Sequence, residues 1–293
     1  MKRSMEQTIV TDLSRRQNYS AYLQLEQLLD CQTALSEPAH HDEMLFIIQH
    51  QVTELWMKLV IHELEAAIQW LRADRAGKAN KCMSRVKVIQ KQLYNQWSVL
   101  ETLTPSEYAE FRRVFGNASG FQSPQYRLRE ILLGQRDRKM LAVYAHLPEW
   151  HARLESAIES PSVYDEFLAW LHRAGYDIPK TVLQRDFADE RDVDPAVVDI
   201  LRTIYEQPDD HWKGYQLSET FVDIANNFQF WRFRHMKTVE RIIGHQHGSG
   251  GSSGVAFLRR ALRQEFFLEL TAVRTEIHND TLADDAQQGC PYG

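Results

Sequence analysis

Two long stretches of the chain carry apolar residues at intervals of three and four, the spacing of one face of an α-helix. The first follows Pro38 and runs to about Leu71, and the second extends from Asp209 to Ile243. Only 13 Gly and 9 Pro interrupt 293 residues, and there is little of the sustained period-two alternation that indicates strands. The pattern therefore predicts an all-α fold, a single-domain helical bundle built on long core helices.

Shorter amphipathic stretches predict further helices around these two. Thr104-Pro105-Ser106-Glu107 combines a capping box with Pro at the first helical position, and it starts a short helix that ends near Phe115. Asn18 is expected to cap a first helix over 19–32, and Asp42 to cap the first long helix. The other predicted helices span about 80–103, 125–133, 139–145, 153–158, 164–174, 196–206 and 255–270.

A glycine- and serine-rich segment at 248–254 has the composition of a linker, although its free N–H and hydroxyl groups could also close over the charged end of a ligand. The helix beyond it has Phe257 and Leu258 among the apolar residues that it must bury on the same body. The expected organisation is one helical domain over 19–278, with an N-terminal helix at 19–33 that must dock on another surface, a mobile loop at 245–254, and flexible ends at 1–18 and 279–293.

Charge and composition exclude several classes of protein. The chain has 34 Lys and Arg against 40 Asp and Glu, a net charge of -6, so no overall positive field attracts a nucleic acid. Its N-terminus is polar and its apolar runs fall far short of the roughly 20 residues that cross a bilayer, so we expect a cytoplasmic protein with no membrane partner. Cys31, Cys82 and Cys290 form no C-x-x-C pair, which argues against a disulfide framework, a zinc site and thioether-linked haem.

Other catalytic motifs find little support. The only Glu-x-x-His match, at 37–40, is interrupted by Pro38, so a helical di-iron centre is not predicted. His40-His41-Asp42-Glu43 straddles a helix start and is interpreted as structural. Motifs of serine hydrolases, zinc proteases and nucleotide-binding proteins are absent from the sequence.

His235 lies on an apolar stripe of the second long helix. Phe228 and Trp231 precede it by two turns and one turn, and Val239 and Ile242 follow it by one turn and two turns. A neutral imidazole among aromatic side chains suits the axial ligand of a haem. Spacing alone, however, favours a histidine that is simply packed in the core.

Phe46 and His50 share a face of the first long helix, one turn apart. They could hold an aromatic substrate by packing and by a hydrogen bond, although the spacing by itself favours a surface pair between His50 and Glu54.

Tyr108 and Arg112 are likewise one turn apart, among aromatic residues. An arginine in such surroundings suits a small carboxylate, because its fork donates to both oxygens and the tyrosine hydroxyl can add a third bond. A bond from Arg112 to an internal carboxylate, or stacking at the surface, is an equally good interpretation of the spacing.

Six motifs between His41 and Gly254 form a broader pattern, which extends over about residues 19–270. They are His41-Asp42-Glu43-Met44-Leu45-Phe46-Ile47-Ile48-Gln49-His50-Gln51, Glu54-Leu55-Trp56, Leu103-Thr104-Pro105-Ser106-Glu107-Tyr108, Ser119-Gly120-Phe121-Gln122-Ser123, Trp231-Arg232-Phe233-Arg234-His235-Met236 and Gly250-Gly251-Ser252-Ser253-Gly254. Together they resemble the bacterial tryptophan 2,3-dioxygenases. The related indoleamine dioxygenases look much less similar in these segments.

The resemblance implies an enzyme with one b-type haem per subunit, enclosed by the helices. Such an enzyme inserts both atoms of O₂ across the C2–C3 bond of L-tryptophan to give N-formyl-L-kynurenine, the first step of tryptophan catabolism by the kynurenine pathway. The alternatives are a haem-binding sensor and a related indole-oxidising enzyme on the same scaffold. Arg112 argues against the latter, because a substrate without a carboxylate would leave the guanidinium unpaired.

The resemblance also implies roles for individual residues. His235 is the proximal iron ligand, Phe46 packs on the indole, and the catalytic residue His50 hydrogen-bonds the indole N–H and positions it without being an obligatory base. Arg112 and Tyr108 bind the carboxylate. Ser119, Gly120, Tyr126 and Trp231 line the haem region, and Tyr19, Tyr22 and Leu23 close the pocket of a neighbouring subunit in a homotetramer.

Ser249 departs from the family pattern, which usually has Thr at this place in the active-site loop. The hydroxyl is kept and the methyl group is lost, which removes some packing and stiffness. We therefore expect the same contact with tryptophan from a more mobile loop.

Overall fold

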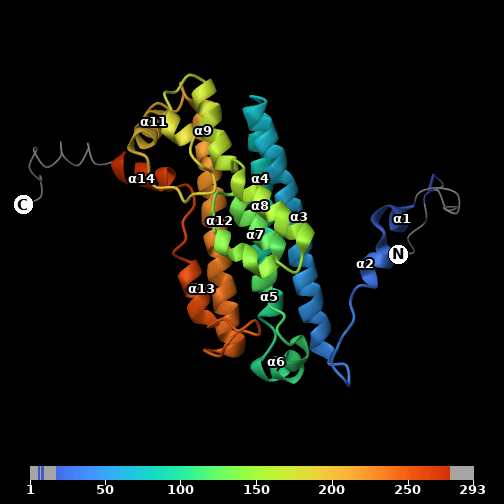
Figure 1. Cartoon of the computed structure of the whole chain (residues 1–293). Helices are drawn as coiled ribbons and strands as arrows, with labels where there is room; N and C mark the ends of the chain where they lie inside the picture. Colours follow the sequence, from blue (N-terminus) through green and yellow to red (C-terminus); the bar gives the residue numbers. More distant parts are fainter. Residues whose placement is uncertain (1–5, 7, 10–17, 278–293) are drawn as a thin grey trace, which may run out of the picture.

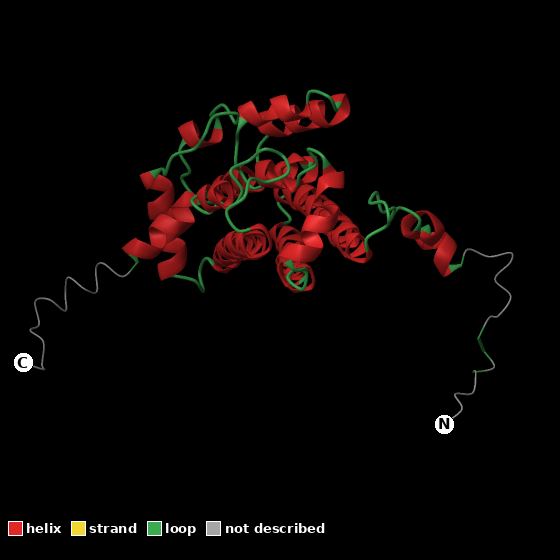
Figure 2. Ribbon diagram, turned by 90° about the horizontal axis from the view of Figure 1, so that it is seen from below, coloured by secondary structure: helices red, strands yellow, loops and turns green. Residues whose placement is uncertain are grey.

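The computed structural model describes residues 6, 8–9 and 18–277, and within them every regular element is a helix (Figure 2). The predicted all-α fold is confirmed. The ends expected to be flexible, 1–18 and 279–293, lie outside the described residues except for 6, 8–9 and 18. None of the described helices is both long and apolar enough to cross a membrane.

Three long helices form the centre of the molecule: α3 (His41–Arg72), α4 (Ala76–Asn95) and α12 (Trp212–Ile243). They run side by side, and α4 packs along both α3 and α12 (Figure 1). Each contributes buried apolar residues at helical spacing, so burial of these faces holds the three together. These residues are Met57, Val60, Leu64, Ala67 and Leu71 on α3, Ala79, Met83, Val86 and Leu93 on α4, and Leu217, Phe221, Ile224 and Phe228 on α12.

Shorter elements surround this centre. They are α5 (Trp97–Leu100), α6 (Pro105–Phe111), α7 (Pro124–Leu132), α8 (Pro148–Glu159), α9 (Val163–Arg173), α10 (Lys180–Leu183), α11 (Pro195–Glu206), α13 (Val255–Ala261) and α14 (Leu268–Glu276), with 3₁₀ turns η1 (Arg112–Phe115), η2 (Gly120–Gln122) and η3 (Arg138–Tyr144). Helices α7 and α9 pack on α3, whereas α13 packs on α12 and α14 on α11.

The helix starts show which caps were predicted correctly. Thr104 forms the predicted capping box with Glu107, ahead of Pro105. The prediction for Asp42 was wrong, because the His40 side chain accepts the Asp42 N–H and Asp42 lies inside the first turn of α3. The buried Glu43 accepts hydrogen bonds from the backbone before α3 and so fixes the chain that leads into the helix.

Three stretches predicted as single helices are broken. The segment 80–103 divides into α4 and α5 at Gln96. The segment 19–32 forms α1 (Tyr19–Leu23) and α2 (Leu25–Leu29), separated by Gln24 in the left-handed conformation. The segment 255–270 ends as α13 at Ala261, and α14 begins after Phe267, which is also left-handed. Both α1 and α2 stand away from the bundle in the two views and bury no residue (Figures 1 and 2).

Candidate functional site

His235 lies on α12 against a wall of indole rings. The Trp97 ring stacks on the imidazole, with centroids 4.7 Å apart and planes inclined by 12°, and the Trp231 ring lies 5.4 Å away. Neither ring nitrogen of His235 has a hydrogen-bond partner among the described residues. Burial, with a smaller contribution from repulsion by His50, lowers the pKa of His235 to about 4, so the imidazole is neutral and its lone pair is free.

His50 lies on α3 and is held differently. Its Nδ1 is 2.7 Å from the backbone carbonyl oxygen of Phe46, which can only accept, so Nδ1 carries the proton and donates. Burial lowers the pKa of His50, which keeps the ring neutral. The remaining nitrogen, Nε2, is therefore an acceptor.

The two imidazoles come from different long helices. His50 lies on α3 and His235 on α12, both of which pack along α4 at the centre of the molecule. The sequence predicted each histidine separately, and a charge on His50 would add to the lowering of the pKa of His235.

Phe46 anchors an aromatic cluster on the His50 side. Its ring stacks on Phe115 at 4.6 Å and lies 4.1 Å from the His50 ring. Tyr108 and Phe111, both on α6, lie 5.9 Å from the Phe46 ring. The cluster forms one apolar wall, so the predicted aromatic packing site is assembled from α3, α6 and η1.

Arg112, the first residue of η1, extends from this wall toward the loop at 245–254. Its guanidinium carbon is 5.8 Å from the Tyr108 ring centroid, so the two residues lie together as the sequence predicted. The two terminal nitrogens donate to the side-chain oxygen of Gln246 and to the backbone carbonyl of His247. The interpretation of Arg112 as paired with an internal carboxylate is therefore wrong for this structure, since both acceptors are neutral.

The loop at 245–254 is docked on the segment around Ser119. The Ser249 hydroxyl donates to the Ala118 carbonyl at 2.5 Å. A Cβ at Gly250 would lie 2.6 Å from the Cβ of Ser119, so only glycine permits this approach. Ser119 itself caps η2, which begins at Gly120. Ser249 of the loop thus lies next to the segment that holds Ser119 and Gly120, two site residues predicted from another part of the chain.

Trp231, which lies beside the His235 ring, also packs against Tyr126, with ring centroids 5.6 Å apart. The Tyr126 hydroxyl accepts a hydrogen bond from Arg232, and burial raises the pKa of Tyr126 to about 12. Arg232 also pairs with buried Glu130 of α7 and donates to the carbonyls of Ala261, the last residue of α13, and of Gln264. This network fixes α12, α7 and α13 relative to one another next to the site.

Tyr19, Tyr22 and Leu23 are not near these residues. They lie on α1, apart from the bundle, and are 75%, 71% and 40% exposed. The single chain therefore does not bring them to the rest of the predicted site.

Three contacts were missed from the sequence. Trp97 stacks on His235, and Gln246 and His247 accept hydrogen bonds from Arg112. A tryptophan near the end of a helix is a weak signal, and residues 246 and 247 carry no motif. Each contact joins segments far apart in the chain, which periodicity cannot relate.

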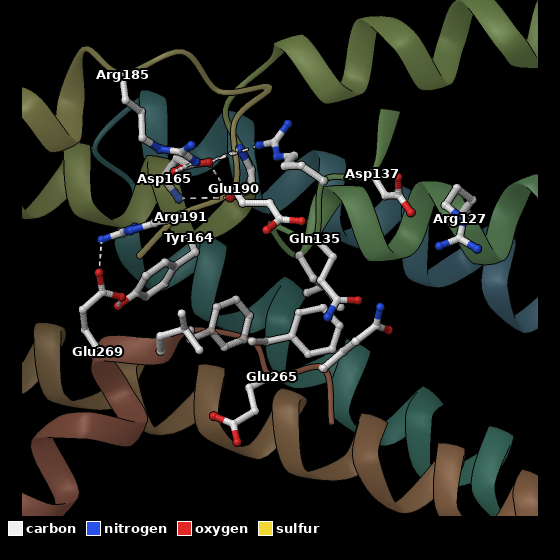
Figure 3. Close-up of a pocket in the computed structure, with 18 residues that line it drawn as sticks. Arg127, Gln135, Asp137, Tyr164, Asp165, Arg185, Glu190, Arg191, Glu265 and Glu269 are labelled. Carbon is white, nitrogen blue, oxygen red and sulfur yellow. Dashed lines mark hydrogen bonds and ion pairs between the residues drawn. The ribbon is translucent and has the colours of Figure 1, made fainter. Parts of the chain in front are cut away.

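A cavity of about 260 Å³ lies elsewhere, where the chain after α7 and the start of α9 meet residues 185–191 and 264–269 (Figure 3). None of the predicted site residues lines it. Arg136 and Arg185 both pair with Asp165, and Arg191 pairs with Glu269. The cavity is thus lined by ion pairs and lies apart from the residues that the sequence predicted for the site.

The residues around His235 fit a haem. A neutral imidazole is one of the protein ligands that bind a haem iron, and the two indoles provide flat apolar surface beside it. In the described part of the chain, the indole N–H groups of Trp97 and Trp231 are buried without a hydrogen-bond partner. No group of three or more His, Cys, Asp or Glu suited to a metal ion occurs within residues 18–277.

Comparison with known proteins identifies the family. A family model described as tryptophan 2,3-dioxygenase matches residues 4–202 and 198–277. The chain is 55% identical to a tryptophan 2,3-dioxygenase of Arthrobacter sp. (strain FB24), with 94% of this chain and 97% of the relative covered. It is 53% identical to that of Serratia proteamaculans (strain 568), covering 94% and 99%, and 52% identical to that of Xanthomonas euvesicatoria pv. vesicatoria (strain 85-10), covering 98% of each. The resemblance noted in the motifs is confirmed, and the chain belongs to the tryptophan 2,3-dioxygenase family.

Proposed function

We propose that this chain is a haem-dependent dioxygenase that inserts both atoms of O₂ across the C2–C3 bond of L-tryptophan to give N-formyl-L-kynurenine. The observation that carries the proposal is the aromatic wall in which Phe46 contacts His50 and Phe115, with Arg112 and Tyr108 at its edge. A neutral imidazole, that of His235 on another of the central helices, stacks on Trp97. Family membership over nearly the whole chain supports the same reaction.

His235 would hold a b-type haem, one per subunit. The neutral imidazole offers a lone pair to iron, Trp97 fixes the plane of the ring, and Trp231 and Tyr126 would line the macrocycle together with Ser119 and Gly120. When bound, the haem iron supplies the oxygen chemistry of the reaction.

His50 and Phe46 would orient the indole ring. Because Nδ1 of His50 donates to the Phe46 carbonyl, Nε2 is left to accept a hydrogen bond from the indole N–H. The Phe46 ring, held by Phe115, offers its surface to the flat substrate. His50 then acts by positioning the substrate, and the mechanism requires no proton removal by this side chain.

Arg112 would bind the tryptophan carboxylate, with Tyr108 beside it. A planar fork and a carboxylate make two parallel hydrogen bonds, and the half-buried surroundings strengthen them. Ser249, on the loop that reaches Arg112, would contact the ammonium or carboxylate group. Closing this loop over the amino-acid end would exclude water from the reacting ring.

We further propose that the chain assembles as a homotetramer in which α1 of one subunit covers the site of a neighbour. Tyr19, Tyr22 and Leu23 are exposed on a helix that buries none of its residues. Aromatic residues that remain exposed in this way are typical of a surface that another subunit covers.

The proposal is tested by loading the full chain with haem, reducing it without oxygen, and then adding O₂ and L-tryptophan. We expect N-formyl-L-kynurenine to accumulate, with both added oxygen atoms labelled when ¹⁸O₂ is used. Binding of haem without tryptophan-dependent consumption of O₂ would instead indicate a sensor. Oxidation of indole lacking the amino-acid group at an equal rate would indicate a different indole-oxidising enzyme.

A further inference from the structure

The guanidinium of Arg112 already donates hydrogen bonds to two oxygen atoms of this chain. One terminal nitrogen of the guanidinium donates to the side-chain oxygen of Gln246, and the other donates to the backbone carbonyl of His247. This is one oxygen on each terminal nitrogen, the same pattern that a carboxylate makes with an arginine fork. Each terminal nitrogen thus has one N–H group committed to an oxygen of the chain, and a carboxylate that approaches this end of the fork competes with Gln246 and His247.

The backbone around Gln246 is held in a defined position. Gly254 has φ +58°, and a Cβ there would lie 2.4 Å from the Gln246 carbonyl oxygen, so only glycine lets the two ends of the loop meet. The Gly248 N–H donates to the Ser252 carbonyl at 3.1 Å, which closes the loop on itself. Gln246 is thus presented to Arg112 by the loop that also carries Ser249.

We propose that Gln246 is a specificity-determining residue that acts as an internal stand-in for the substrate carboxylate. The inference rests on the proposed function of Arg112. Without a ligand, the Gln246 amide oxygen accepts a hydrogen bond from the partly exposed Arg112 guanidinium in place of water. A carboxylate that binds the same N–H group must displace Gln246, so the apparent affinity falls as the fraction of molecules with Gln246 bound rises.

The chemistry of the amide decides which ligands succeed. A neutral amide oxygen is a weaker acceptor for a guanidinium than a charged carboxylate, so tryptophan displaces Gln246. Tryptamine, the same indole amine without the carboxylate, gains nothing from Arg112 and leaves Gln246 in place. The contact therefore affects ligands that carry a carboxylate and has no effect on those that lack one.

The test compares Gln246→Ala and Gln246→Glu in the haem-loaded full chain, with L-tryptophan and tryptamine titrated against the reduced protein without O₂. For Gln246→Ala we expect tryptophan to bind about three- to tenfold more tightly, with KM falling in parallel and kcat unchanged, because one competing hydrogen bond is lost. Binding of tryptamine should not change. Gln246→Glu should weaken tryptophan binding by roughly tenfold or more, since a carboxylate then competes for Arg112.

Gln207→Glu is the matched control, because Gln207 is exposed at the end of α11. This substitution adds the same negative charge away from the site. Weaker tryptophan binding in Gln246→Ala would overturn the proposal, since Gln246 would then contact the substrate directly. Equal effects on tryptophan and tryptamine would also overturn it. If the unmodified chain binds tryptophan and forms product while both variants behave like it, only the role of Gln246 fails. If the unmodified chain does neither, the proposed function fails as well.

Discussion

His50 and His235 are both imidazoles on apolar stripes of 32-residue helices, yet the molecule holds them in different ways. The ring of His50 is tied to its own helix by the hydrogen bond from Nδ1 to the Phe46 carbonyl. The ring of His235 makes no hydrogen bond to any described residue and is held by the face of Trp97, which comes from α5. One histidine is fixed by local backbone, and the other by a distant side chain.

The difference separates two roles that the residue type alone does not distinguish. A histidine with one nitrogen committed as a donor presents a single acceptor in a fixed direction, which suits orienting a substrate N–H. A histidine held only by stacking keeps a lone pair free, and a water or carbonyl can still take its other N–H, which suits an iron ligand. Both rings are neutral because burial lowers the pKa of each.

The largest effect is expected from His235→Ala. Removing the only imidazole at the stacked position should abolish stable haem binding and with it the dioxygenase activity. Haem titration followed by absorption measures this directly. His172→Ala, which removes an exposed imidazole at the end of α9, is the control and should bind haem normally. Unchanged haem affinity in His235→Ala would mean that another residue is the ligand.

His50→Ala should have a smaller effect. Haem binding should be retained, and turnover should fall by about ten- to a hundredfold, because the indole loses its fixed hydrogen bond but keeps its packing on Phe46. Steady-state rates and a haem titration on the same sample separate the two quantities. Complete inactivity in a variant that still binds haem and tryptophan would contradict a positioning role and make His50 an obligatory base.

The same contrast shows what could be predicted from the sequence. Phe46 with His50, and Tyr108 with Arg112, are one helical turn apart, so the repeat of the helix was enough to pair them. The capping box at Thr104 was equally local.

The contacts that define each role were not local. Trp97 reaches His235 only because α4 and α5 lie along α12, and Gln246 reaches Arg112 only because the loop folds back on α6 and η1. The left-handed residues Gln24 and Phe267 broke two helices whose periodicity had predicted continuity. Neither is a residue that favours this conformation, so no local signal marked the breaks.

A pH dependence follows from the way His50 is held. Burial lowers the pKa of His50 below the ordinary value near 6.5, so the ring is neutral at neutral pH. Protonation at lower pH would place a proton on Nε2 and remove the acceptor, so tryptophan affinity should fall only on the acid side and with a midpoint below 6.5. Titrations of tryptophan between about pH 5 and 8 measure this, with His50→Ala expected to lack the acid limb. A midpoint above 6.5 would show that the ring is not shielded as described.

Trp97 gives the smallest expected effect and the sharpest test of the contrast. Aromatic stacking contributes about 0.5–1.5 kcal/mol, so Trp97→Leu should weaken haem binding by roughly two- to tenfold and shift the absorption bands. Trp97→Phe keeps an aromatic ring and should weaken haem binding by a smaller factor. Trp212→Phe, at the exposed start of α12, is the control. The acid limb of tryptophan binding should stay in place in Trp97→Leu, because α3 holds His50 without help from Trp97. A displaced acid limb would mean that the two imidazoles are not held independently.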